Sequence, residues 1–132
     1  MPQQAPLILI IDDEPEFVEI LKTKLVSVGF RVQTASGGEE GIREIKAAPP
    51  DLVLLDMKMP GLSGADTLLK IKEDPAMKGV KVVFLTNFGD PRAEFSADEK
   101  FAKDLGAAGY LKKTDDLDAM VQNIQLFLPA GQ

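Results

Sequence analysis

The amino-acid sequence predicts one α/β domain, in which a parallel sheet of five strands lies between two layers of helices. Three observations lead to this fold class. Residues 7–11 and 52–55 are large and apolar at every position, as is typical of strands buried on both faces of a parallel sheet. Segments with helical spacing of apolar residues alternate with such runs, which is the order of repeated βα units. The length of 132 residues, with 45% hydrophobic content, suits a single core.

The first βα unit is a strand at residues 7–11 followed by a helix. The strand ends at Asp12 and Asp13. Pro15 suits the first position of a helix, and Gly29 is a natural stop at its other end. The apolar positions between them follow helical spacing: Phe17, Ile20, Leu21, Leu25 and Val28.

The second unit is the least apolar of the five. Residues 31–35 alternate between polar and apolar side chains, which predicts a less buried strand. Ser36 is placed to cap the helix that follows, which carries Ile42 and Ile45 and ends before Pro49.

The third strand, at residues 52–56, ends on an acid, Asp56. A Pro-Gly turn at residues 60–61 follows it. Ser63 and Asp66 then form an imperfect capping box, which predicts a helix that ends at residues 74–75.

The last two units complete the pattern. Residues 80–85 form the fourth apolar strand, which leads to Thr86, and after a long loop a capping box at residues 96–99 opens a short helix through Asp104. Residues 108–111 form the fifth strand, followed by Lys112 and Lys113. The final helix has an apolar face of Leu117, Met120, Val121, Ile124 and Leu128.

Five βα units with right-handed crossovers give a doubly wound parallel sheet with five helices, a three-layer αβα arrangement of the flavodoxin-like type. Strand order is not readable from periodicity. We expect residues 1–6 to be a disordered lead-in, residues 7–128 to form the domain and residues 129–132 to be a C-terminal tail.

Composition excludes several classes of function. A formal net charge of −6 and a pI near 4.6 disfavour direct binding to nucleic acid or to an anionic membrane. The chain has no cysteine and no histidine, so thiolate or histidine zinc sites and a histidine general base are excluded. The N-terminal apolar run is too short for a signal peptide. A cytoplasmic protein is therefore expected.

Residues with reactive side chains follow four of the predicted strands. Because the carboxyl ends of parallel strands lie at one edge of the sheet, Asp12, Asp13, Asp56, Thr86 and Lys113 are expected to converge there. Clustered carboxylates repel one another unless a cation offsets them, and oxygen ligands suit Mg²⁺. Asp56 would then be a nucleophile that forms an acyl phosphate.

Taken singly, each residue has a plainer interpretation. Asp56 alone is more often a strand terminator, and Asp12 and Asp13 alone suit the positive end of a helix dipole. Thr86 alone is most often a strand-end hydroxyl, and Lys113 alone is usually a solvated charge. The prediction of a site depends on their occurrence together.

Four motifs in this order resemble the receiver domain of two-component response regulators: IIDDE after the first strand, LLDMKMPGLSG after the third, LTN after the fourth and GAAGYLKK in the fifth. The resemblance covers about residues 7–128. It implies that Asp12, Asp13 and the backbone carbonyl of Lys58 hold Mg²⁺ beside Asp56, the phosphoacceptor. It also implies that Thr86 is the switch hydroxyl, Tyr110 the aromatic switch residue and Lys113 the phosphate-contacting lysine.

By the same resemblance, the protein is expected to be a phosphorylation-dependent switch that accepts a phosphoryl group from a histidine kinase or a phosphotransfer protein and hydrolyses it slowly. It would signal by contact with another protein, and a phosphorylation-dependent homodimer is compatible with this. The sequence departs from the family at Thr114, where proline is usual, and in a longer segment around residues 89–94.

The sequence argues against two alternative functions and leaves a third alternative open. A phosphatase of the haloacid dehalogenase type also uses a strand-end Asp, but it needs a second Asp two residues later, where this chain has Lys58. A flavodoxin that binds FMN needs a Ser/Thr/Gly-rich phosphate loop after the first strand, where this chain has acids. The sequence leaves open whether the chain is a stand-alone receiver or the N-terminal part of a longer transcriptional regulator.

Overall fold

The computed structural model describes residues 5–86, 104, 106–113 and 116–128. Its five strands form one sheet in which every neighbouring pair is parallel, in the order β2-β1-β3-β4-β5. This is the doubly wound, flavodoxin-like order, so the predicted fold class is confirmed. The strands are β1 (Leu7–Ile11), β2 (Arg31–Ala35), β3 (Leu52–Asp56), β4 (Val82–Thr86) and β5 (Gly109–Lys112).

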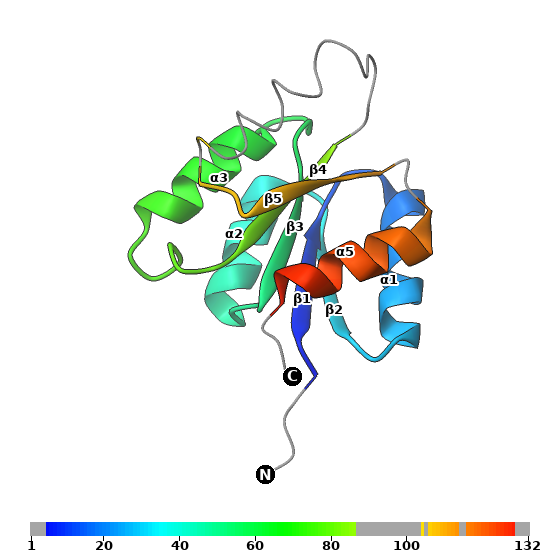
Figure 1. The fold of residues 1–132 in the computed structure, drawn as a ribbon. Coiled ribbons are helices and arrows are strands. Elements are labelled where there is room, and N and C mark those ends of the chain that lie inside the picture. The colour runs from blue at the N-terminus through cyan, green and yellow to red at the C-terminus, as the bar shows by residue number, and fades with distance from the viewer. Residues whose placement is uncertain (1–4, 87–103, 105, 114–115, 129–132) are drawn as a thin grey trace.

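Helices cover both faces of the sheet. Figure 1 shows α2 (Gly38–Ala47) and α3 (Gly64–Glu73) on one face and α1 (Pro15–Ser27) and α5 (Leu117–Phe127) on the other. Among the described residues, no helix is both long and apolar enough to cross a membrane. Of the short helix predicted at residues 96–104, all but Asp104 lies outside the described residues. The same is true of residues 1–4 of the expected lead-in, the 129–132 tail, the segment around residues 89–94 and Thr114.

The core has two halves, one on each face of the sheet. Alternate strand residues such as Leu9 and Leu55 pack with α2 and α3, while their neighbours Ile8 and Leu54 pack with α1 and α5. Because both faces are covered, these strands need apolar side chains at every position. This explains the uninterrupted apolar runs in the sequence.

Several predicted helix ends are confirmed. Pro15 is the first residue of α1, and Gly29 follows its end with a positive φ of 104°. The Ser63 hydroxyl accepts a hydrogen bond from the Asp66 N–H at 3.1 Å and so caps α3. Asp116 caps α5 in the same way, with Ala119 N–H as the donor at 2.8 Å.

The predicted cap at Ser36 is wrong. The N-cap of α2 is Gly37, and Ser36 instead donates from its backbone N–H and its hydroxyl to Glu40 Oε1, each at 2.9 Å. Packing against α3 sets this start, since a Cβ on Gly38 would lie 2.1 Å from Thr67 Oγ1. Gly38 lets α2 approach α3 closely, and Ser36 is left one position outside the cap.

The bounds of two strands also differ from the prediction. β4 begins at Val82 instead of residue 80 and includes Thr86, and β5 covers Gly109 to Lys112 instead of residues 108–111. The pairing register explains the shift, because Thr86 is aligned with Lys112 across the ladder. Both strands therefore extend one residue further toward the carboxyl edge of the sheet.

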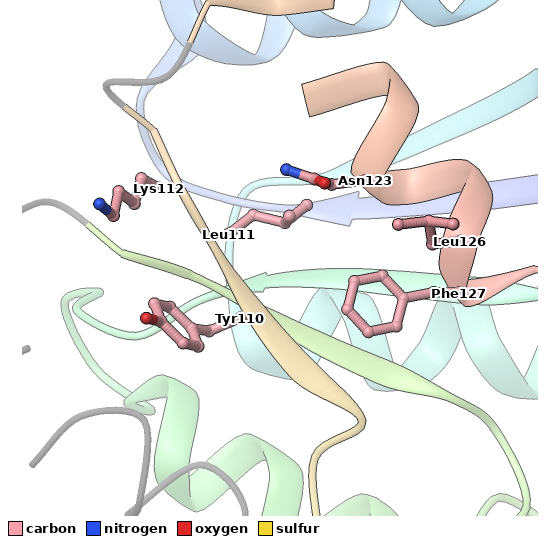
Figure 2. A pocket seen from close by; sticks show the side chains of 6 residues that line it. All are labelled: Tyr110, Leu111, Lys112, Asn123, Leu126 and Phe127. Atoms are coloured by element: carbon pink, nitrogen blue, oxygen red, sulfur yellow. The ribbon is translucent and has the colours of Figure 1, made fainter. Parts of the chain in front are cut away.

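The end of α5 is fixed against β5. Figure 2 shows Leu126 and Phe127 of α5 beside the strand that carries Tyr110 and Leu111. A Cβ on Gly109 would lie 2.7 Å from the Phe127 ring, and the Lys81 ammonium donates to the Phe127 carbonyl at 2.6 Å. The glycine therefore provides the space in which the Phe127 ring sits.

Candidate functional site

The residues predicted to carry chemistry meet at the carboxyl edge of the sheet. Asp56 and Thr86 are the last residues of β3 and β4, while Asp12 and Lys113 directly follow β1 and β5. Backbone hydrogen bonds hold the two that follow strands: Asp12 N–H donates to the Ala35 carbonyl at 3.0 Å, and Lys113 N–H donates to the Thr86 carbonyl at 2.9 Å. The main chain of the sheet thus positions the site.

Three carboxylates form the acidic part of the site. Oxygen atoms of Asp12, Asp13 and Asp56 lie within 4.8 Å of one another. Asp12 is 2% exposed and Asp56 is 6% exposed, while Asp13 faces solvent. One oxygen of each buried acid accepts a backbone hydrogen bond: Asp12 Oδ1 from Glu14 N–H at 2.9 Å and Asp56 Oδ1 from Lys58 N–H at 3.3 Å.

The other oxygens of this cluster suit a metal ion. Asp12 Oδ2 is buried and accepts no hydrogen bond of regular geometry within the described residues, although the Lys113 ammonium lies 2.6 Å away. Three carboxylates whose oxygens lie this close together, one of them exposed to solvent, are a ligand set that suits a hard divalent cation such as Mg²⁺. The residues present therefore fit the predicted metal. The role predicted for the Lys58 carbonyl stays a prediction.

Lys113 supplies the positive charge. Its side chain is 4% exposed, and its Nζ lies 2.6 Å from Asp12 Oδ2 and 3.4 Å from Asp56 Oδ2. The same ammonium is ion-paired with Glu14 Oε1 and lies 4.9 Å from the centroid of the Phe17 ring. Lys113 is therefore the lysine that enters the site, as its place in the sequence predicts.

Sequence reasoning did not identify Glu14 and Phe17 as site residues. Glu14 is the N-cap residue of α1, a position where Ser, Thr, Asp and Asn are preferred and where its side chain makes no capping hydrogen bond. A glutamate at this position, directly after two aspartates, is the signal that was available.

Burial and charge change the acidity of the site. Burial, with a contribution from the Asp12 charge, raises the pKa of the Asp56 carboxyl to about 6, and the Lys113 ammonium opposes this only in part. Burial likewise raises the pKa of Asp12. For Lys113, burial alone would lower the pKa, but its close contacts with the Asp12 and Glu14 carboxylates outweigh burial and the pKa is raised. Lys113 therefore stays charged, whereas keeping Asp12 and Asp56 ionised costs free energy.

The two predicted switch residues lie on neighbouring strands. Thr86 is buried, and its hydroxyl donates to the Leu111 carbonyl over a long 3.4 Å. Tyr110 is half-buried on β5 and packs against the core half of α2 and α3. Figure 2 shows its ring directed away from α5. Neither role is tested by this geometry, but the weak hydrogen bond leaves the Thr86 hydroxyl free to change partner at little cost.

Gly64 packs against the backbone of Asp56, and this role was not predicted from the sequence. A Cβ at this position would lie 2.2 Å from the Asp56 carbonyl oxygen and 2.7 Å from Met57 Cα. The Gly64 N–H also donates to the Met57 carbonyl at 3.1 Å. The start of α3 therefore rests directly on the backbone of Asp56, which only glycine allows.

Comparison of the sequence with protein families and with individual proteins identifies related response regulators. A family model described as the response regulator receiver domain matches residues 8–125. The transcriptional regulatory protein KdpE of Mycobacterium tuberculosis is 33% identical over 119 residues, which cover 90% of this chain and 49% of that protein. The DNA-binding dual master transcriptional regulator RpaA of Synechocystis is 30% identical over 123 residues, 93% of this chain and 49% of that protein.

Solved structures agree with the sequence matches. The N-terminal domain of a response regulator receiver protein from Methanoculleus marisnigri is 35% identical, with a TM-score of 0.71 and coverage of 92% of this chain and 94% of that one. A CheY-like receiver domain protein from Methanospirillum hungatei is 26% identical, with a TM-score of 0.79 and coverage of 93% of each chain. In contrast, the chain spans only 26% to 49% of the length of the first curated relatives that it matches.

Proposed function

We propose that this chain, which belongs to the response regulator receiver domain family of two-component systems, is switched by transfer of a phosphoryl group to Asp56. One observation carries the assignment to Asp56. Its carboxylate is the buried strand-end acid that lies both within the acidic cluster and 3.4 Å from the Lys113 ammonium.

The proposed reaction is a direct displacement. An Asp56 carboxylate oxygen attacks the phosphorus of the donor, which is a phosphohistidine of a histidine kinase or phosphotransfer protein, or a small phosphodonor. The new O–P bond forms as the donor's P–N or P–O bond breaks, and the electron pair of that bond stays on the donor atom, which water or the donor protein then protonates. The Lys113 ammonium offsets the charge of the phosphoryl oxygens.

We assign the metal site to Asp12, Asp13, Asp56 and the Lys58 carbonyl, with Mg²⁺ as the ion. The closeness of the three carboxylates and the buried position of Asp12 Oδ2 support this assignment. When bound, Mg²⁺ supplies charge stabilisation to the phosphoryl oxygens. Asp12 and Asp13 then serve to hold the ion, and Lys58 N–H continues to orient the Asp56 carboxylate.

Signalling follows from a change at Thr86 and Tyr110. The Thr86 hydroxyl would leave the Leu111 carbonyl for a phosphoryl oxygen, and the space that it vacates would alter the position of Tyr110 on the adjacent strand. The downstream partner is a protein, and the acidic domain itself does not bind DNA. A cytoplasmic location and a phosphorylation-dependent homodimer are parts of the same proposal. The alternative, in which the chain is the N-terminal part of a longer transcriptional regulator, is compatible with the same reaction at Asp56.

The phosphatase alternative is not favoured by the site. The second acid that it needs would stand at residue 58, where Lys58 contributes its backbone N–H to Asp56 and its side chain is no acid. The chain is accordingly proposed to be a phosphoacceptor module and not a metabolic enzyme.

A labelling experiment tests the proposal. The protein is incubated with Mg²⁺ and a small acyl phosphate, and its intact mass is measured before and after brief alkaline treatment that hydrolyses acyl phosphates. We expect one labile phosphoryl group on the wild type and on Asp66→Asn, which replaces an exposed acid of α3. Asp56→Asn should take up none. Equal labelling of Asp56→Asn and the wild type would refute the assignment.

A further inference from the structure

Glu14 uses its carboxylate in an unusual way. It occupies the N-cap of α1, yet its side chain accepts no hydrogen bond from the first turn of the helix. The carboxylate is instead ion-paired with the Lys113 ammonium, 99 positions later in the chain. A side chain at the start of α1 thus contacts the lysine that directly follows β5.

The contacts of Lys113 are concentrated on the α1 side. Asp12 Oδ2 lies 2.6 Å from Nζ, Glu14 is in contact and the Phe17 ring lies 4.9 Å away, while Asp56 Oδ2 is further off at 3.4 Å. An ammonium over an aromatic face gains electrostatic stabilisation as well. In the unphosphorylated protein, Lys113 is therefore held mainly by Asp12 and by the start of α1, and only loosely by the phosphoacceptor.

We propose that Glu14 is a positioning residue that holds Lys113 while Asp56 is unphosphorylated and releases it to the phosphoryl group. This inference rests on the proposed function, since it names the resting partner of the lysine that acts at Asp56. The exposed fractions of Glu14 and Asp12 explain why Glu14, and not Asp12, separates from Lys113. The Glu14 side chain is 51% exposed, so water solvates it after separation, whereas the Asp12 side chain is fully buried.

The proposal predicts different effects on the rate of phosphoryl transfer to Asp56 and on the rate of hydrolysis. The Glu14 charge stabilises Lys113 only before phosphorylation, so its removal should speed the transfer of the phosphoryl group to Asp56. Lys113 is already on the phosphoryl group during hydrolysis, so the rate of hydrolysis should stay the same. A partly exposed ion pair of this kind corresponds to a change of about two- to five-fold in rate.

The test compares Glu14→Gln with Glu16→Gln at saturating Mg²⁺. Glu16 is an exposed acid of the same helical turn, so its substitution removes the same charge near the site without touching Lys113. We expect Glu14→Gln to be phosphorylated by a small acyl phosphate about two- to five-fold faster than Glu16→Gln, with equal hydrolysis rates after the donor is removed. Equal phosphorylation rates, or hydrolysis accelerated by the same factor, would overturn the proposal.

A second measurement needs no phosphodonor. Nitrogen-15 NMR of lysine ammonium groups at low temperature reports how fast their hydrogens exchange with water, and Lys113→Arg assigns the signal. In the unphosphorylated protein, exchange at Lys113 should be faster in Glu14→Gln than in Glu16→Gln. Unchanged exchange would refute the role of Glu14. If the wild type took up no phosphoryl group at Asp56, the proposed function would fail, whatever this experiment showed.

Discussion

Replacement of Asp56 by asparagine is expected to stabilise the metal-free protein. The carboxyl has an ordinary pKa of 3.8 and a pKa of about 6 in the folded chain, because it is buried beside Asp12. Each unit of pKa corresponds to about 1.4 kcal/mol, so the ionised carboxylate destabilises the fold by about 3 kcal/mol above pH 6. Asparagine has nearly the same shape and no charge, so it removes this destabilisation.

The stability difference between the wild type and Asp56→Asn should depend on pH. Because the folded pKa lies above the unfolded one, the unfolded chain loses the Asp56 proton first as the pH rises. The wild type therefore loses stability relative to Asp56→Asn between about pH 4 and pH 6, and the difference stays constant at higher pH. At pH 7.5 the variant should be more stable by about 3 kcal/mol, and below about pH 3, where the carboxyl is protonated in both states, the two should be equal.

Urea unfolding followed by circular dichroism, in EDTA and at several pH values, measures this difference. With a urea dependence of about 2 kcal/mol per molar, the midpoint should rise by about 1.5 M at pH 7.5. Added Mg²⁺ should narrow the gap, because the ion binds the folded wild type. Asp66→Asn serves as the control and should stay within about 0.5 kcal/mol of the wild type. A variant no more stable than the wild type at pH 7.5, or a difference independent of pH, would refute the reasoning.

Two further substitutions test the support of the site. Gly64→Ala should destabilise the protein by about 1 to 3 kcal/mol in urea unfolding and slow the labelling of Asp56, because its Cβ would overlap the Asp56 carbonyl. Gly79→Ala, where nothing lies within 4 Å, is the control, and equal losses in the two would contradict this role. Lys113→Ala should cost the metal-free protein about 3 to 5 kcal/mol at pH 7.5, because Asp12 and Asp56 lose their buried counter-ion. The loss should shrink at pH 5, where the Asp56 carboxyl, with its pKa of about 6, takes up a proton, and a loss that is the same at both pH values would count against the ion pairs.

Much of the fold was predictable because each strand of a parallel sheet is buried on both faces. That requirement produces the continuous apolar runs at residues 7–11 and 52–55, which no amphipathic helix would show. The convergence of Asp12, Asp56 and Lys113 was predictable for a related reason, since parallel strands bring their carboxyl ends to one edge. The order of the motifs along the chain was therefore enough to predict which residues meet at this edge.

Features that depend on contacts between distant segments were not predictable. The start of α2 depends on how closely Gly38 approaches Thr67, so the local preference of Ser36 for a cap was overruled. The position of Gly64 beneath the Asp56 carbonyl also becomes visible only when α3 is in place. The pairing of Glu14 with Lys113 joins the first and last strand ends, and neither residue type specifies the other in sequence.

The hydrogen bonds by which Asp12 and Lys113 extend the sheet come from main-chain atoms, whatever side chain each residue carries. At this edge, side chains determine the chemistry and main-chain atoms hold the structure. A substitution of Asp12 or Lys113 by any uncharged residue except proline therefore changes the charge that this edge presents and leaves the main-chain donor available for its hydrogen bond.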